Sequence, residues 1–497
     1  MLESIYWIFA IEVIGLAAFP LAFALFPKLT DRGYTTSKIL GIIIIGYISW
    51  ILSVLHILPS VRVSLIILVL IMASLSIWYI LRNKKEFLNF FVSQYKVIIL
   101  SEILFLLVIT AWTVYRSYDP SINHTEQPMD FAFLNASIQS YIGFPEDPWL
   151  EGHAISYYYF GYWMMGVISE MTGIASNISY NLSLSLIPAL LATGVFGLVY
   201  NLTSSNKNFK QISIIAGLIV TLLISVSGNL EGILELMRTN GIGSFNYWNW
   251  IHIKGMEIPI GDATHGWLPQ EFWWWFRASR VINSFEGLEA IDFTIQEFPF
   301  FSFLLGDLHP HLMSLPFVIL FISLCWHWFL STPQPPNILK KKQAILVLLM
   351  GLLLGGLAFT NLWDLPTFWT LFLVLAALKS YQFSDGRMRT ILRQAVPVSL
   401  AVLGIAILLY LPYFLTFRGS VSGILPVTVA TRPVHTFIVW GLFMITITPF
   451  LIGVFCETRL RSDWRRTSML GLTIGFTPYI IWALLYLTIN AGDLTDL

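Results

Sequence analysis

Two acidic residues stand close together in a loop, residues 116–156, directly after a strongly apolar segment. Glu126 and Asp130 are four apart, and Pro128 between them favours a helix start, because the first turn does not need the N–H that proline lacks. A helix over 129–142 would hold both carboxylates near its beginning. There they could serve one reacting centre as a general base, or bind a divalent cation. The alternative is that Asp130 only complements the helix dipole and Glu126 is solvated.

Asp307, His309 and His311 form a second polar cluster, at the end of loop 228–308. Alternate residues do not share a helix face, so the three converge only if the segment is a turn. Such a turn could do acid–base chemistry or hold a cation. The alternative makes Asp307 the N-cap of the following helix. If a cofactor binds, it is a divalent cation, Mg or Mn, and its candidate ligands are Glu126, Asp130, Asp307 and His309.

Other polar residues are candidates for substrate contact. Arg277 and Arg280 stand three apart beside a run of tryptophans, so on a helix they would share a face and could clamp a phosphate. An aromatic belt with arginines that snorkel to the membrane interface explains the same pattern equally well. Asp364 lies in a polar break between two apolar stretches, and His124 precedes the first pair of carboxylates.

Residue composition places these clusters in a membrane protein. Of 497 residues, 56% are hydrophobic and 11% are charged, whereas about 25% are charged in a typical soluble domain. The 28 basic and 28 acidic residues cancel, which excludes a general attraction to nucleic acid. Cys325 and Cys456 fit neither a zinc site nor a redox pair. Motifs for nucleotide binding, serine hydrolysis and zinc proteolysis are missing from suitable contexts.

Apolar segments of roughly 20 residues are long enough to cross a membrane as helices, and we expect about thirteen. They run over residues 5–27, 38–58, 61–81, 97–115, 157–173, 181–200, 211–227, 311–330, 343–362, 367–380, 394–416, 434–455 and 468–489. The expected fold class is therefore all-α and polytopic. We divide the chain into N-terminal transmembrane helices, 1–95, and a membrane core, 96–497, with loops 116–156 and 228–308.

Basic residues indicate which connections face the cytoplasm. They cluster at residues 28–38, 82–85, 340–342, 387–393 and 459–466. The N-terminus, the acidic tail and the first long loop are then expected outside. Strict alternation puts loop 228–308 inside, because three predicted helices separate the two loops, yet the basic cluster after it requires it to be outside. One re-entrant segment within 157–310, or one further crossing within 298–305, would resolve the conflict.

Four motifs in order resemble a known family. They are HTEQPMDFAFLNA, ISYYYFGYW, FPFFSFLLGDLHPHLMSLPF and FTNLWDLPTFW, within residues 100–370. The chain resembles the YYY membrane protein family, a domain of unknown function found in archaea and bacteria. That family is distantly similar to the GT-C superfamily of polytopic glycosyltransferases, which implies a GT-C-like core with two long extracytoplasmic loops.

The GT-C likeness implies an enzyme of the hexosyltransferase class in the cell membrane, acting in the cell envelope. Its partners would be membrane lipid and a polyprenyl-phosphate-linked sugar, passed to an acceptor on the outer face. Such enzymes carry acidic residues in an early outside loop, and Glu126 and Asp130 occupy that place as the catalytic candidates. Tyrosine rings would stack on the sugar. The residues expected to contact substrate are His124, Tyr157, Tyr158, Tyr159, Arg277, Arg280, Asp307, His309, His311 and Asp364.

Two other classes of protein fit the same sequence. In a transporter or channel the polar residues would line a permeation path near the membrane midplane, often between two similar halves. The chain shows no convincing internal repeat, and its polar residues lie at loop edges, which favours an enzyme. An envelope-assembly scaffold without catalytic activity is the third possibility, with the aromatic loops binding a partner.

Overall fold

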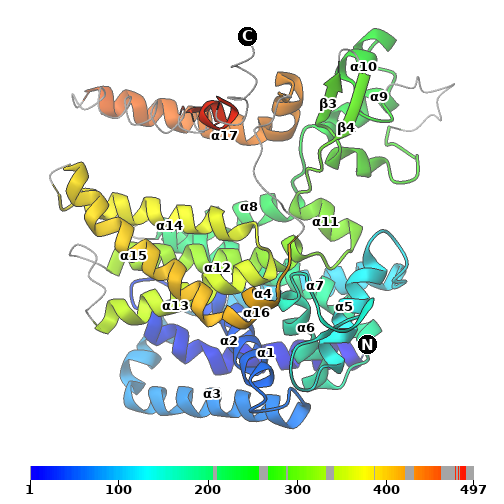
Figure 1. Cartoon of the computed structure of the whole chain (residues 1–497). Helices are drawn as coiled ribbons and strands as arrows, with labels where there is room; N and C mark the ends of the chain where they lie inside the picture. Colours follow the sequence, from blue (N-terminus) through cyan, green and yellow to red (C-terminus); the bar gives the residue numbers. More distant parts are fainter. Residues whose placement is uncertain are drawn as a thin grey trace. The chain divides into compact units, whose positions relative to one another are not determined.

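Helices dominate the described part of the chain (Figure 1). The computed structural model describes residues 2–204, 210–256, 267–286, 289–331, 341–384, 387–419, 430–460, 476, 479–480 and 482–487. It is 77% helical, and its strands form two short antiparallel hairpins. Within the described residues, nine helices are long and apolar enough to cross a membrane, or ten if the bent pair α8–α9 is one span. The expected all-α, polytopic class is confirmed.

Contacts divide the chain into two compact units. The first comprises residues 1–225 and 305–419, and the second comprises 226–304 and 420–497. The elements of the first unit are α1 (Leu2–Leu25), η1 (Tyr34–Thr36), α2 (Ser37–Val54), α3 (Arg62–Arg82), α4 (Lys84–Tyr118), α5 (Gln127–Gln139), β1 (Glu146–Asp147), β2 (Leu150–Ala154), α6 (Phe160–Thr172), α7 (Ser176–Thr203), α8 (Lys210–Val226), α12 (Pro310–Ser331), α13 (Lys341–Thr360), α14 (Asp364–Tyr381), α15 (Met388–Leu409) and α16 (Leu411–Thr416).

The expected apolar segments coincide with helices, with three differences. α6 has 13 residues and so rises only about 20 Å, short of the roughly 30 Å hydrocarbon layer. Segment 394–416 is broken at Tyr410, after which the short α16 begins at Leu411 with Pro412 in its first turn. Most of segment 468–489 lies outside the described residues.

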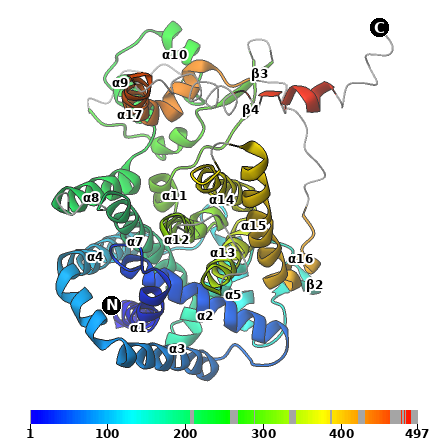
Figure 2. The same ribbon diagram turned by 90° about the vertical axis from the view of Figure 1, so that its left-hand side faces the viewer.

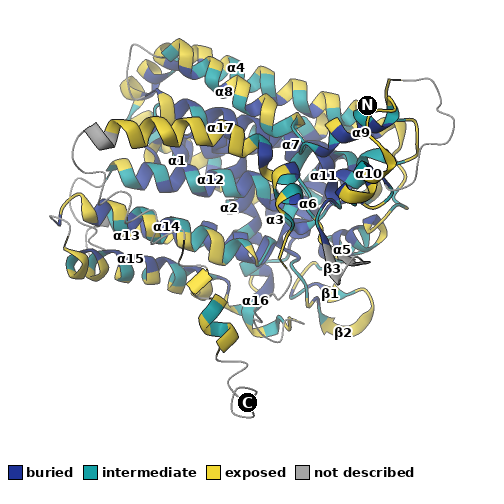
Figure 3. Ribbon diagram, turned by 90° about the horizontal axis from the view of Figure 1, so that it is seen from above, coloured by how far each residue is buried: buried dark blue, intermediate teal, exposed yellow. Residues whose placement is uncertain are grey.

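The helices of the first unit surround α7, which is buried along most of its length. It packs against α4 and α12, while α2 packs on α1 and α15 on α13 (Figure 2). Many large apolar residues on α3, α4 and α15 are exposed, and exposed residues colour much of α4 and α15 in Figure 3. A soluble protein seldom exposes apolar surface of that extent, so these outer faces suit contact with lipid.

An aromatic cluster holds α2, α6, α13 and α15 together. Phe160 stacks on Phe359 at 5.0 Å between ring centroids, and Trp50 lies 5.0 Å from the same ring. The indole N–H of Trp50 donates to the hydroxyl of Tyr159 at 3.1 Å, which satisfies both polar atoms. Gly355 lets the Tyr410 ring lie against the α13 backbone, where a side chain at 355 would clash.

A buried ionic cluster joins α1, α2 and α4. Lys38 Nζ lies 2.7 Å from Glu102 Oε2 and 3.1 Å from Glu12 Oε2. The hydroxyl of Tyr34 donates to Glu102 at 2.7 Å. Lys38, which the sequence placed among cytoplasmic loop cations, is therefore a buried residue whose charge is paired between helices. Charges inside apolar helices are costly unless paired, so this cluster fixes how the three helices meet.

The second unit has its own small core. Its elements are α9 (Glu231–Thr239), α10 (Phe245–Ile251), η3 (Trp274–Ser279), β3 (Asn283–Glu286), β4 (Glu289–Phe293), α11 (Pro299–Leu305) and α17 (Pro433–Leu460). Leu234, Trp248, Ile253, Val281 and Ile438 pack together in it. This core shows that the second loop is folded and packs against α17.

Candidate functional site

The first half of the site is the start of α5. Pro128 sits in the first turn, as its chemistry favours, and the helix covers Gln127–Gln139 where 129–142 was expected. Asp130, Phe133 and Ser137 share the buried face of this helix, while Glu126 precedes it as the N-cap. The two acidic residues therefore meet different surroundings, although they are only four apart.

The second half of the site is the turn that precedes α12. Gly306 has φ +73°, a left-handed conformation that glycine adopts without strain. Gln127 Nε2 donates to the Gly306 carbonyl at 3.1 Å, which ties this turn to the start of α5. Asp307 and His309 follow outside any helix or strand, and His311 lies in the first turn of α12, which begins at Pro310. Residues 306–309 are thus not helical, which is the condition that the sequence set for Asp307, His309 and His311 to converge.

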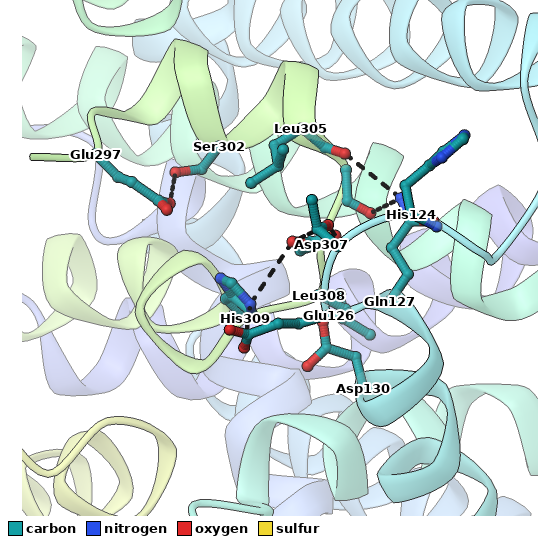
Figure 4. Close-up of polar contacts among 12 residues, drawn as sticks. His124, Glu126, Gln127, Asp130, Glu297, Ser302, Leu305, Asp307, Leu308 and His309 are labelled. Carbon is teal, nitrogen blue, oxygen red and sulfur yellow. Dashed lines mark hydrogen bonds and ion pairs between the residues drawn. The ribbon is translucent and has the colours of Figure 1, made fainter. Parts of the chain in front are cut away.

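Glu126, Asp307 and His309 come together across the two halves (Figure 4). Thr125 Oγ1 contacts the Asp307 carboxylate at 2.5 and 2.6 Å. His309 Nε2 lies 3.1 Å from Glu126 Oε2 and 3.7 Å from Asp307 Oδ2. The side chain of Asp307 is 2% exposed and that of Glu126 is 60% exposed. We call Asp307, His309 and Glu126 the carboxylate–histidine relay: it runs from a buried acid to one that faces solvent.

Asp130 lies beside the relay but is fully buried. Tyr162 donates its hydroxyl proton to Asp130 Oδ1 at 2.6 Å, while Oδ2 makes no hydrogen bond of ordinary geometry in the described part of the chain. Burial, with smaller contributions from the carboxylates of Asp307 and Glu126, raises the pKa of Asp130 to about 8, although the hydrogen bond from Tyr162 acts in the opposite direction. Asp130 is therefore mostly protonated at neutral pH.

Asp130→Asn should change how stability depends on pH. The folded pKa of about 8 lies above the ordinary value of 3.8, so the contribution of Asp130 to stability is complete below pH 3.8. That contribution falls by about 1.4 kcal/mol per pH unit as the pH rises towards 8. Asparagine does not titrate. We expect the melting temperature of Asp130→Asn to gain on that of the wild type between pH 5 and pH 8.

The matched control for this prediction is Glu151→Gln, which neutralises an exposed carboxylate in the same loop. Its melting curve should follow that of the wild type at every pH. Parallel curves for Asp130→Asn and the wild type across this range would show that Asp130 is ionised in the folded protein.

The other polar candidates of the first unit lie around this centre. His124 Nε2 lies 3.0 Å from Asp119 Oδ2, at the loop surface. The rings of His311 and His309 are 5.4 Å apart. Asp364 begins α14 and interacts electrostatically with His311. His311 thus lies beside His309 of the relay, Asp364 lies near His311, and His124 stands two residues before Glu126.

The three tyrosines have different environments. Tyr157 stacks on Phe133 of α5 at 5.3 Å, and Tyr158 stacks on Phe417 at 5.8 Å. Tyr159 is fully buried in the aromatic cluster. Two of the three rings thus lie near the surface, where a sugar could reach them, and the third supports the packing of the helices.

Arg277 and Arg280 belong to the second unit. Arg277 lies in η3 and pairs with both Glu235 and Glu271, the latter at 2.6 Å, so its charge is neutralised within the unit. Arg280 follows η3, lies 4.6 Å from the Phe276 ring centroid and donates to Ser279 Oγ at 2.7 Å. Burial lowers the pKa of Arg280. A phosphate clamp formed by these two arginines stays a prediction.

Metal binding also stays a prediction. Among the four candidate ligands, Glu126 and His309 contact each other directly, and Asp307 accepts from Thr125. Asp130 is turned towards Tyr162. Mg²⁺ would take one or two of these carboxylates as ligands, together with water and phosphate oxygens.

Sequence reasoning missed Thr125 and Tyr162. Thr125 stands directly before Glu126, so its position was a signal, but its partner Asp307 lies 182 residues away. Tyr162 is 32 residues from Asp130 in a motif rich in aromatic residues, and its type alone gave no reason to single it out.

Fold and site together define a polytopic helical membrane protein with a polar centre between the ends of its long apolar helices. The chain belongs to the family described as "Uncharacterized membrane protein (DUF2298)", which it matches over residues 44–492. The expected membership of a membrane-protein family of unknown function is confirmed to that extent. Comparison with curated proteins and with solved structures finds no match.

Proposed function

We propose that this chain is an integral membrane glycosyltransferase that moves a sugar from a polyprenyl-phosphate carrier to an acceptor hydroxyl on the outer face of the membrane. The observation that carries the proposal is the carboxylate–histidine relay. It presents one exposed carboxylate, Glu126, held by His309 and backed by the buried Asp307. A base placed at the end of spanning helices can reach both a membrane-bound donor and a water-soluble acceptor.

The transfer assigns a role to each residue of the relay. Glu126 takes the proton of the acceptor hydroxyl as the acceptor oxygen bonds to the anomeric carbon of the sugar. The bond from that carbon to the carrier phosphate breaks, and its electron pair leaves with the lipid phosphate. His309 orients Glu126 through the contact of its Nε2 with Glu126 Oε2, and the buried carboxylate of Asp307 lies 3.7 Å from the same nitrogen, close enough to act on His309 electrostatically. Attack from the face opposite the phosphate inverts the configuration at the anomeric carbon.

Asp130 has a different role in this scheme. It is neutral at pH 7 and hydrogen-bonded to Tyr162, so it positions the first turn of α5 and takes no proton from the acceptor. Of the two acids that the sequence offered, Glu126 is therefore the base.

A polar pocket on the other face of α5 suits a hydroxyl-rich acceptor. It has a volume of about 700 Å³ and lies between α5 and β1. That volume falls in the range of typical ligand sites, 300 to about 1,000 Å³. Its polar lining residues include Asn135, Gln139, Glu146 and Asp147.

The test is transfer by the purified protein in lipid nanodiscs. Polyprenyl-phosphate hexoses serve as donors, with a hydroxylated acceptor, and the product is followed by mass spectrometry. Product that forms with the wild type and is lost in Glu126→Gln supports the proposal. Bound donor without product, across hexose donors and acceptors, contradicts it.

The short α6 suggests an orientation for the chain. If α6 does not cross, only α7 and α8 cross between loops 116–156 and 228–308. Both loops and the N-terminus are then outside, and every basic cluster falls on the cytoplasmic side. The re-entrant segment that the sequence required within 157–310 would be α6. This assignment makes α14 a crossing helix as well.

Cysteine labelling tests this orientation. With the exposed Cys456 changed to serine, and the buried Cys325 kept, Ile242→Cys places one exposed thiol in the second loop. We expect an impermeant maleimide to label it from outside in intact cells. Glu151→Cys is the outside reference and Lys84→Cys the cytoplasmic one. Labelling of Ile242→Cys only after the cells are opened would put the second loop inside.

A further inference from the structure

A second polar pocket lies where α4 ends and α7 begins. Its volume is about 350 Å³, and Ser4 of α1 completes its wall. The polar side chains that matter here are Arg116, Ser117, Ser121, Asn177, Asn181 and Ser185. No acidic residue contributes to its lining. Hydroxyl and amide groups around one arginine are the donors that proteins use to bind an oxyanion.

Arg116 is a buried cation that hydrogen-bonds to a neutral amide and interacts with the nearby Asp119 only electrostatically. It is 6% exposed, and its Nε and Nη2 atoms donate to Asn181 Oδ1 at 3.1 and 2.9 Å. Within the described chain it makes no ion pair at 4.0 Å or less, whereas Arg277 makes two. A buried charge is costly without a counter-charge, so an anion in this pocket would stabilise Arg116.

The start of α7 adds a second source of positive potential. Asn177 and Ile178 of its first turn line the pocket. The N-cap, Ala175, has no side chain that can accept from the first-turn N–H groups. The Ile178 N–H donates to the Ala175 carbonyl at 3.0 Å, but the dipole of this 28-residue helix still favours a negative charge there. Two independent features, the guanidinium of Arg116 and the first turn of α7, thus line the same pocket.

The pocket adjoins the relay through Gly306. A Cβ on Gly306 would lie 2.6 Å from Arg116 Nη1, so the missing side chain is what lets the guanidinium approach this turn. Asp307 of the relay follows directly, and Gln127 binds the same turn. An anion on Arg116 would therefore be held next to the turn that carries the relay.

We propose that the Arg116 pocket binds the phosphate group of a lipid. Its wall also includes the apolar Ile178 and Leu182, which suits a ligand whose chain extends into the membrane. The inference rests on the proposed function in one respect: in sugar transfer, the ligand would be the carrier phosphate, and Arg116 would stabilise it as the leaving group. The guanidinium fork matches phosphate oxygens, which a single ammonium cannot do as well.

Binding by variants in nanodiscs tests the proposal. The probes are a polyprenyl monophosphate, the matching uncharged polyprenol, phosphatidic acid and inorganic phosphate, each titrated by native mass spectrometry. We expect Arg116→Gln to weaken binding of the polyprenyl monophosphate by about tenfold or more, and Arg116→Lys to weaken it less. Arg82→Gln, which removes an exposed arginine at the end of α3, is the matched control and should bind as the wild type does.

The binding measurements decide whether the Arg116 pocket holds a lipid phosphate. Equal binding by Arg116→Gln and the wild type, or equal binding of polyprenol and its phosphate, overturns the proposal. Inorganic phosphate that binds as tightly as the lipids, and depends on Arg116, overturns the lipid as source. Tight binding of phosphatidic acid supports a general site for lipid phosphate. If Arg116→Gln fails to fold, Asn181→Ala keeps the arginine but removes its acceptor, and unchanged binding by that variant overturns the proposal.

The two proposals can fail separately. Arg116-dependent binding of the phosphate lipid without any sugar transfer contradicts the glycosyltransferase and leaves the phosphate site standing. Transfer that persists unchanged in Arg116→Gln contradicts the phosphate site alone. Glu126→Gln should bind the polyprenyl monophosphate as the wild type does, because Glu126 is not part of the pocket.

Discussion

Glu126→Gln should slow sugar transfer by about 10² to 10⁴-fold while donor binding stays within about twofold of the wild type. Glutamine keeps the shape of the side chain and can still contact His309, but it cannot accept the proton of the acceptor hydroxyl. Glu126 is the exposed member of the relay, so a soluble acceptor reaches it first. The measurement is the initial rate of product formation at saturating donor, with donor affinity measured on the same preparation.

Glu151→Gln is the matched control for this variant. It makes the same chemical change at an exposed position of the same loop, in β2. Its transfer rate should equal that of the wild type. A Glu126→Gln rate within about tenfold of the wild type, below the range for a lost general base, would remove Glu126 from the chemistry.

Lys38→Met should destabilise the protein by about 3–5 kcal/mol, the usual effect of removing one partner from a buried ion pair. The variant leaves Glu12 and Glu102 close together between apolar helices without their cation. Unfolding in a detergent titration, with retained helical circular dichroism as the readout, measures the change. Lys96→Met, at an exposed position of α4, is the control and should change stability by less than about 0.5 kcal/mol.

A second substitution separates charge from packing. Glu102→Gln combined with Lys38→Met removes one of the two unpaired acids, so the double variant should be less destabilised than the sum of the single changes. The expected coupling is about 0.5–3 kcal/mol. Additive effects would mean that Lys38 stabilises the helices through packing alone.

Much of the fold could be predicted because apolar length decides it. Runs of roughly 20 apolar residues have one favourable arrangement in lipid, a helix with all its backbone groups paired. The exception is instructive: segment 157–173 has the composition of a crossing helix, but Tyr157–Tyr159 precede the helix start at Phe160. Composition does not reveal that a helix starts late, because aromatic residues suit both a helix and a packed turn.

The candidate site could be predicted in part. Carboxylates and imidazoles at loop edges are unusual enough to notice, and Glu126 and His309 do lie together although 183 residues separate them. The arginines show what could not be predicted from the sequence. From the sequence, Arg277 with its tryptophan neighbours is the stronger candidate for binding a phosphate, because Arg116 resembles an ordinary basic residue at the end of a helix. Only their partners in the folded protein distinguish the two arginines. Arg277 is neutralised by two glutamates, whereas Arg116 contacts a neutral amide and can therefore bind an anionic ligand.

Gly306 lies next to both the relay and the Arg116 pocket, and any side chain at this position would meet Arg116. This has an evolutionary consequence. Relatives that keep the arginine at position 116 should keep the glycine at position 306. Relatives that lose the arginine lose only one of the two reasons for glycine there, because the positive φ of 73° still favours it. An alignment of the family in which the two positions vary independently would show that neither constrains the other.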